Sequence, residues 1–145
     1  MKSKLLALTL FSFLFSLATF AQDNVLGKWK TIDDETGKPK SIVEIYKKDG
    51  KVYGKIVKLF REEGEEKDPI CDKCEDNRKD QKIIGMTIIT DMEWDEGDNE
   101  WDDGEILDPK KGTVYDCKLW VEDGKLQVRG YIAFFFRTQT WVRAE

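Results

Sequence analysis

The sequence predicts an all-β protein, a single antiparallel up-and-down barrel of eight strands. Apolar and polar residues alternate along most of the chain after residue 25, which is the period of a half-buried strand. Turn residues divide this pattern into short segments, and no segment has the i, i+3, i+4, i+7 spacing of an amphipathic helix. Because sequential hairpins leave exposed edges unless the sheet closes, a barrel is favoured over a β-sandwich.

The first segment is interpreted as a cleaved signal peptide over residues 1–21. Lys2 and Lys4 precede an apolar stretch of 16 residues, and small residues then lead to a cleavage site before Gln22. This is the order of charge, apolar core and small residues found in secretory signals. A retained anchor is less favoured, since spanning a bilayer takes about 20 apolar residues. One domain, residues 22–145, remains.

Eight segments rich in Val, Ile, Tyr, Trp and Thr are expected to form the strands. The residue pairs 49–50 and 123–124 are both Asp-Gly, the strongest signal for a two-residue type I′ hairpin. The stretch 61–82 is too long for a hairpin loop, and we interpret it as a lid or a strapped loop. The expected strands are 26–33, 40–48, 51–60, 83–94, 100–107, 112–122, 125–135 and 136–143.

The charge balance argues against several partners. The whole chain has a net charge of −5, and loss of Lys2 and Lys4 leaves 22 positive against 29 negative charges, or −7. Nucleic acid requires a basic surface, so we expect no nucleic-acid partner. Anionic lipid surfaces are disfavoured for the same reason, and no stable membrane insertion is expected.

We expect no enzymatic activity, no catalytic residues and no cofactor. The chain has no His, which excludes Ser-His-Asp and Cys-His arrangements and every zinc site that needs imidazole. After residue 21 the one Ser is Ser41, and its neighbour Lys40 points to the opposite face of a strand. Glycine-rich phosphate loops are absent from the sequence, and most carboxylates fall in turns and exposed positions.

The three cysteines are expected to have structural roles. Cys71 and Cys74 form a C-x-x-C within the long polar stretch, with no second C-x-x-C and no βαβ context. A small disulfide is favoured, and a redox pair, partial metal binding or free thiols remain alternatives. Cys117 alternates with Tyr115 and Leu119, so it is expected to be a buried, free thiol.

The first and last strands contain a recognisable pair of residue types. Gly27-Lys28-Trp29 opens the first strand, and Arg137 and Arg143 lie on one face of the last. This pattern resembles the lipocalin signature. The resemblance implies that Trp29 closes one barrel end and that an Arg lies over its ring, a cation–π contact. Spacing alone leaves both arginines as candidates.

A second resemblance covers nearly the whole mature chain. The motifs are Gly27–Asp34 with Thr36-Gly37-Lys38, Ser41-Ile42-Val43, Gly50–Ile56, Cys71-x-x-Cys74, Ile83–Met86, Gly104-x-Ile106–Pro109, Gly112-x-x-Tyr115, Val128–Tyr131 and Arg137–Trp141. Together they resemble an uncharacterised bacterial family, domain of unknown function 2147. Phe135-Phe136 stands where the family pattern has a Gly. The resemblance implies an exported lipocalin-like barrel, periplasmic or extracellular, with no established activity.

The densest acidic run, from Asp91 to Asp108, begins like a calcium loop. Asp103 stands where an EF-hand needs Gly, and the twelfth position from Asp98 is Pro109 instead of Glu. An EF-hand is therefore excluded, and no metal site is predicted. A weak surface calcium site or a surface for a protein partner remain alternatives.

We expect the barrel to bind a small apolar or amphipathic ligand inside. Gly54, Gly85 and Gly130 are expected within strands, where glycine leaves space, and a few polar groups would orient the ligand. The alternative is a closed structural barrel that meets an unknown protein partner through its acidic surface, around Trp94 and Trp101. The residues expected to line the ligand site are Tyr46, Tyr53, Met86, Tyr115, Arg129 and Tyr131.

Overall fold

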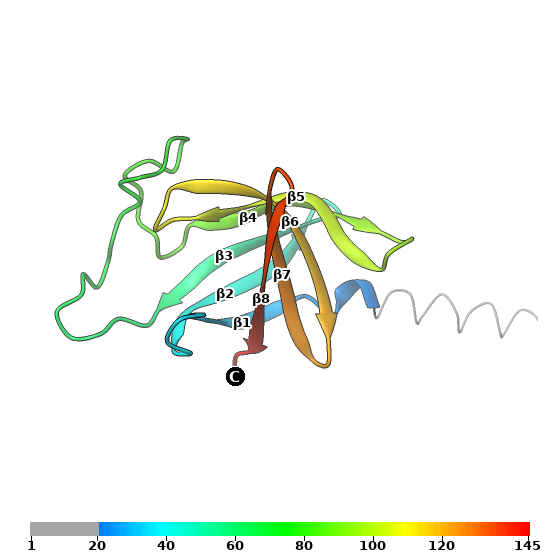
Figure 1. Ribbon diagram of the computed structural model, residues 1–145, viewed down its shortest axis with the longest axis horizontal. Helices are drawn as coiled ribbons and strands as arrows, with labels where there is room; N and C mark the ends of the chain where they lie inside the picture. Colours follow the sequence, from blue (N-terminus) through cyan, green and yellow to red (C-terminus); the bar gives the residue numbers. More distant parts are fainter. Residues whose placement is uncertain (1–20) are drawn as a thin grey trace, which may run out of the picture.

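The computed structural model describes residues 21–145 and shows a closed barrel of eight antiparallel strands (Figure 1). Each strand pairs with the next along the chain, and β1 pairs with β8 to close the barrel. The predicted fold class is confirmed. The predicted signal peptide lies, apart from Ala21, outside the described residues. The strands are β1 (Gly27–Ile32), β2 (Pro39–Lys48), β3 (Lys51–Leu59), β4 (Thr87–Asp95), β5 (Glu100–Asp108), β6 (Thr113–Glu122), β7 (Lys125–Ile132) and β8 (Phe135–Arg143).

The two Asp-Gly hairpins have the predicted geometry. Asp49 and Gly50 have φ of 52° and 78°, and Asp123 and Gly124 have 51° and 71°. Positive φ at both central residues matches the right-handed twist of the flanking strands. These two turns lie at one end of the barrel, whereas the long β3–β4 connection and the β5–β6 turn lie at the other (Figure 1).

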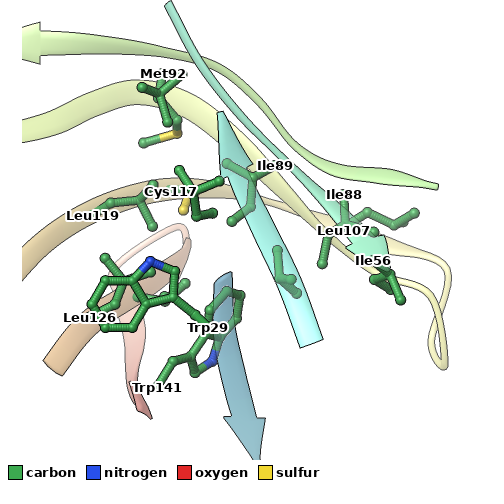
Figure 2. Close-up of a cluster of buried hydrophobic side chains, with 14 of the residues drawn as sticks. Trp29, Ile56, Ile88, Ile89, Met92, Leu107, Cys117, Leu119, Leu126 and Trp141 are labelled. Atoms are coloured by element: carbon green, nitrogen blue, oxygen red, sulfur yellow. The ribbon is translucent and has the colours of Figure 1, made fainter. Parts of the chain in front are cut away.

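Side chains fill the interior of the barrel in the half that contains Trp29. Trp29, Trp101, Leu119, Leu126 and Trp141 are each at most 2% exposed, and Figure 2 shows four of them together. Gly54, within β3, adds no empty space here. A Cβ on Gly54 would lie 2.9 Å from Cδ1 of Ile45, so the neighbouring side chain already occupies the volume. The expectation that strand glycines leave a void is therefore wrong at this position.

Strand β4 departs from the predicted alternation. It begins at Thr87, so Gly85, with a φ of 92°, lies in the preceding turn and not within a strand. Asp91 has a φ of 57°, and the β3–β4 register shifts around it. Such a bulge inserts one residue and exchanges the two faces. Met92 therefore points inward with Ile89, and both side chains are fully buried.

The long connection between β3 and β4, the cysteine loop (residues 60–86), packs against the β5–β6 turn. Cys71 and Cys74 are bonded to each other and buried, which confirms the favoured disulfide. Sγ of Cys71 lies 3.5 Å from the carbonyl oxygen of Pro109. A Cβ on Gly112 would overlap the Lys73 carbonyl oxygen, and Gly112 has a φ of 71°. Glycine at this position therefore permits the loop to dock.

The segment before β1 covers the opposite end of the barrel. The Nε1 groups of Trp29 and Trp101 donate hydrogen bonds to the carbonyl oxygens of Val25 and Gln22, at 2.7 and 3.0 Å. Val25 is 1% exposed. Within residues 21–145, no helix is long and apolar enough to cross a membrane.

Candidate functional site

The two ends of the barrel are built differently, and one of them is sealed by the predicted Trp–Arg pair. The guanidinium of Arg143 lies 3.7 Å from the centre of the Trp29 ring. It also donates hydrogen bonds to the carbonyl oxygens of Leu26 and Asn24, at 2.6 and 2.9 Å. Burial lowers the pKa of Arg143. Arg143, and not Arg137, therefore covers Trp29, and we call this the closed end.

The seam between β1 and β8 is paired only near the closed end. Two residue pairs join these strands, Trp29 with Arg143 and Lys30 with Val142. β7 and β8, in contrast, pair from Leu126–Trp141 to Ile132–Phe135. Toward the other end, which we call the mouth, these strands have no backbone pairs. There, side chains of the β1–β2 turn contact β8 instead.

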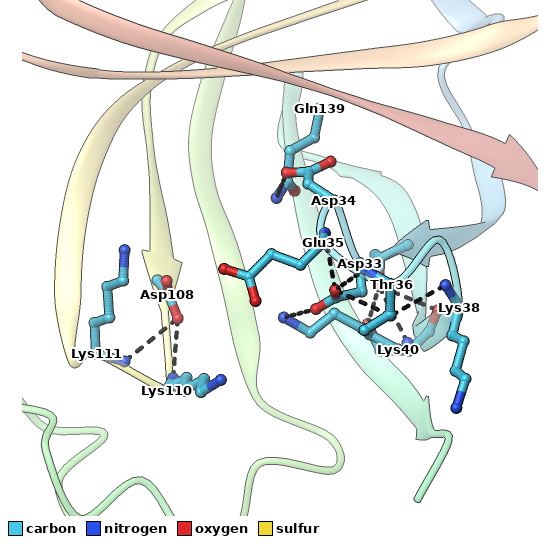
Figure 3. Close-up of polar contacts among 12 residues, drawn as sticks. Asp33, Asp34, Glu35, Thr36, Lys38, Lys40, Asp108, Lys110, Lys111 and Gln139 are labelled. Atoms are coloured by element: carbon cyan, nitrogen blue, oxygen red, sulfur yellow. Dashed lines mark hydrogen bonds and ion pairs between the residues drawn. The ribbon is translucent and has the colours of Figure 1, made fainter.

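The β1–β2 turn is shaped by Asp33. Its Oδ1 accepts hydrogen bonds from the backbone N–H of Thr36 and of Glu35, at 2.8 and 3.0 Å, and from the Thr36 hydroxyl at 3.0 Å (Figure 3). These bonds, the one from the Thr36 backbone foremost, lower the pKa of Asp33. A short Asp side chain bonded to the next backbone N–H groups fixes a tight turn, which here presents Asp34 toward β8.

Asp34 connects the turn to a chain of polar groups on β8. Its Oδ2 accepts a hydrogen bond from Nε2 of Gln139 at 3.3 Å and another from the guanidinium of Arg137. Nε1 of Trp141 donates to Oε1 of Gln139 at 3.2 Å, which fixes the orientation of the amide. A buried hydroxyl pair, Thr31 with Ser41 at 2.7 Å, lies on the neighbouring strands.

The side of the mouth formed by β4, β5 and β6 is apolar. Ile89, Ile106 and Tyr115 are in register across β4, β5 and β6. Gly130 on β7 pairs with Arg137, and a Cβ on Gly130 would lie 3.4 Å from Cβ of Tyr115. Ile106 and Tyr115 are half-buried. The mouth therefore joins an apolar surface to a charged and amide-bearing one.

Of the six residues predicted to line a ligand site, Tyr115 lies at the mouth. The side chains of Tyr46 and Tyr53 stack at 5.8 Å on the outer face of β2 and β3, opposite the buried rows of those strands. Met86 is buried at the end of the cysteine loop, just before β4, at the edge of an outer hollow that this loop lines.

Arg129 and Tyr131 also lie on the outer face of the barrel. The guanidinium of Arg129 is 4.9 Å from the Trp120 ring and 4.5 Å from the Phe136 ring, and the Tyr131 ring is 5.8 Å from that of Phe136. Together, these four side chains form an aromatic and cationic ladder along β6, β7 and β8. They contact one another, and Nε of Arg129 also donates a hydrogen bond to the Thr138 hydroxyl at 2.7 Å.

The acidic run does not form a metal centre within residues 21–145, where no three Cys, Asp or Glu side chains are placed to hold an ion. Lys118 donates to Glu100 at 2.8 Å and lies 3.2 Å from Asp102, and the bond to Glu100 is the main reason that its pKa is raised. Trp101 is fully buried, with Trp94 edge-on at 5.5 Å. Trp101 is therefore unavailable to a protein partner.

Sequence reasoning missed Asp34, Gln139 and Ile106 as site residues. A signal existed for Gln139, since residues 137, 139, 141 and 143 share one parity in the last strand. No sequence pattern indicates that Asp34 contacts Arg137, because the two residues are 103 positions apart in the sequence.

A closed eight-stranded barrel with Trp29 under Arg143 at one end defines a lipocalin-like protein. A solved structure of protein HP1028 from the human pathogen Helicobacter pylori, described as belonging to the lipocalin family, matches with a TM-score of 0.68 over 83% of this chain and 82% of that one. At 17% sequence identity, the match shows a shared fold.

The family itself follows from the sequence. The model of the bacterial family described as "Uncharacterized protein conserved in bacteria (DUF2147)" matches residues 27–143, and the chain belongs to this family. A search of curated proteins found no match.

Proposed function

We propose that the protein binds a small amphipathic molecule at the barrel mouth, without catalysis. The anionic head of the ligand contacts Arg137 and Gln139, and its apolar body lies against Ile106 and Tyr115. One observation carries the proposal: the carboxylate of Asp34 already occupies the two donors, and Arg137 pairs with Gly130, which lies against Tyr115 and Ile106.

The contact with Asp34 is of a kind that a ligand can replace. The side chains of Arg137 and Asp34 are 62% and 39% exposed, and exposed ion pairs contribute little to stability. A guanidinium next to an amide N–H favours a carboxylate, sulfate or phosphate oxygen. An incoming anionic head would therefore displace Asp34 at small cost.

The packing supports a site at the mouth and not deep in the barrel. The closed end is filled by Trp29, Trp101 and Trp141. At the mouth, backbone pairing between β1 and β8 ends at Lys30 and Val142. The β1–β2 turn can then move away from β8 once Asp34 is released, because no strand hydrogen bonds hold it there.

Two fluorescent probes with a similar apolar body and different heads test this proposal. 1-Anilinonaphthalene-8-sulfonate is anionic, and N-phenyl-1-naphthylamine is neutral. We expect the native protein to bind the anionic probe more tightly. Arg137→Gln should abolish this preference, and Asp34→Asn should strengthen binding of the anionic probe about twofold, because the competing carboxylate of an exposed ion pair is removed.

Arg129→Gln is the matched control, since it removes the same charge from the outer face. It should leave both affinities unchanged. Equal loss with Arg129→Gln and Arg137→Gln would contradict the proposal. Failure of all variants to bind either probe would also contradict it and would favour the alternative, a filled barrel that meets a protein partner.

We also infer that the protein is exported. The buried Cys71–Cys74 disulfide supports an oxidising compartment, and residues 1–21 have the residue order of a signal peptide. Mass spectrometry of the protein from its source should find a chain that begins at Gln22. An intact Met1 end would contradict export by cleavage.

A further inference from the structure

The tip of the β7–β8 hairpin exposes a continuous set of large apolar side chains. Phe134, Phe135 and Phe136 are 97%, 79% and 60% exposed, and Ile132 is 49% exposed. Other exposed large apolar residues within 21–145 are scattered at 70, 84 and 114. Apolar residues exposed singly are ordinary, whereas a contiguous patch indicates a binding surface.

The shape of the tip is convex. Ile132 pairs with Phe135 as the last pair of the hairpin, so Ala133 and Phe134 form a two-residue turn. Ala133 has a φ of 50°, in the left-handed region that favours glycine. Phe135 follows the inner face with Ile132, Phe136 follows the outer face with Tyr131, and Phe134 lies at the turn. The three rings therefore diverge from one another.

The charge of this hairpin differs from that of the rest of the chain. Residues 125–143 contain four basic residues and no Asp or Glu, in a chain with 29 acidic residues. Two of the four, Arg129 and Arg137, lie directly below the tip. The guanidinium of Arg129 lies 4.5 Å from the centre of the Phe136 ring. Arg137, on β8, pairs with Gly130, the residue after Arg129. The guanidinium of Arg129 therefore places one positive charge beneath the apolar tip, whereas that of Arg137 is paired with Asp34.

We propose that this hairpin tip docks on a lipid bilayer, with the three Phe rings in the interfacial region and Arg129 near the phosphate groups. Aromatic side chains are favoured at the membrane–water interface, and Arg extends toward headgroups while its stem covers apolar surface. A protein pocket receives side chains from one direction, whereas a bilayer interface accepts rings that diverge. A bilayer is therefore the occupant that the geometry fits.

The remaining charges define the kind of lipid surface. Asp91, Asp103, Glu105 and Asp116 border an outer hollow that also reaches Tyr131 and Ala133, and the whole chain is acidic. These carboxylates would repel a strongly anionic membrane. Docking is therefore expected on zwitterionic phospholipid, shallow and reversible. It does not depend on the ligand proposed for the mouth.

Flotation with phosphatidylcholine vesicles tests the docking. The native protein should float with the vesicles, and Phe134→Ser combined with Phe135→Ser should reduce the bound fraction at least tenfold. Because both side chains are exposed, the variant should keep its fold, and an unchanged melting temperature would verify this. Ile84→Ser is the matched control, since Ile84 is 39% exposed on the cysteine loop, and it should float like the native protein.

Three outcomes would overturn the proposal. One is a native protein that stays at the bottom of the gradient. Another is equal flotation of the double variant. The third is a native protein that self-associates without vesicles and becomes monomeric in the double variant, which would assign the tip to a second copy of the chain.

Discussion

The closed end and the mouth of this barrel use the same residue types in opposite ways. At the closed end, Arg143 lies over a fully buried Trp29 and donates to two backbone carbonyls. At the mouth, Arg137 contacts a single exposed carboxylate on a turn. Both arginines lie on the same face of β8, six residues apart. Arg143 is held by two backbone carbonyl groups and a buried ring, whereas Arg137 is held by one exposed side chain.

The difference separates the end that supports the fold from the end that we propose for binding. Backbone pairing between β1 and β8 exists only at the closed end, where large side chains exclude water. At the mouth the seam is spanned by Asp34, Arg137 and Gln139. Low-stability regions are where binding sites are commonly found, and the exposed aromatic hairpin lies at this end as well.

The largest effect is expected from Trp29→Ala. It removes the buried ring that fills the closed end and leaves Arg143 without its partner. The loss should be about 3–5 kcal/mol of unfolding free energy, as for other large-to-small core changes. Urea denaturation measures it. Trp120→Ala, on the half-buried outer face, is the control and should lose less. A loss under about 0.5 kcal/mol for Trp29→Ala would show that this ring does not support the core.

A smaller loss of stability, unequal at the two ends, is expected from changing each Arg to Gln. Arg143→Gln should cost about 1–2 kcal/mol, because it removes a cation–π contact and two charge-assisted hydrogen bonds. Arg137→Gln should cost under about 0.5 kcal/mol, as an exposed ion pair. The same urea experiment compares them. Equal losses would remove the distinction between the two ends.

The smallest effect is expected at Cys117, which is 1% exposed. Burial raises the pKa of its thiol above the usual 9.0. The folded state therefore resists forming the thiolate, so stability is unaffected below about pH 9 and falls as the pH rises beyond it. Between pH 7 and 9 the native protein should not react with a disulfide reagent, and one thiol should react in denaturant. Three reactive thiols would refute the Cys71–Cys74 bridge.

Strands were predictable from the sequence wherever one face is buried. The alternation of Val43 and Ile45, or of Leu126 and Val128, identifies both the element and its inner face. The bulge at Asp91 was not predictable, because one inserted residue exchanges the inner and outer faces of the strand without changing the residue types. The last turn was missed as well, since Ala133 is not a turn-forming residue, and the predicted strand ran on to residue 135.

The candidate site was less predictable than the strands. Parity placed Arg137 and Arg143 on one face, but their assignment to opposite ends depends on strand register, which turn geometry sets. Aromatic and charged residues such as Tyr46 and Arg129 were expected inside for their polar groups. They lie outside, where Tyr46 stacks on Tyr53 and Arg129 packs between Trp120 and Phe136. Side-chain type alone does not separate these two environments.

The difference between the two ends can be measured directly by methyl NMR while 1-anilinonaphthalene-8-sulfonate is added. If the mouth is the binding site, the methyl signals of Ile106 and Ile89 should shift with the probe concentration. Those of Val25 and Leu126, buried at the closed end, should stay in place, and Arg137→Gln should remove the shifts. Shifts at Val25 and Leu126 without any at Ile106, or shifts that Arg137→Gln leaves intact, would contradict a ligand site at the mouth.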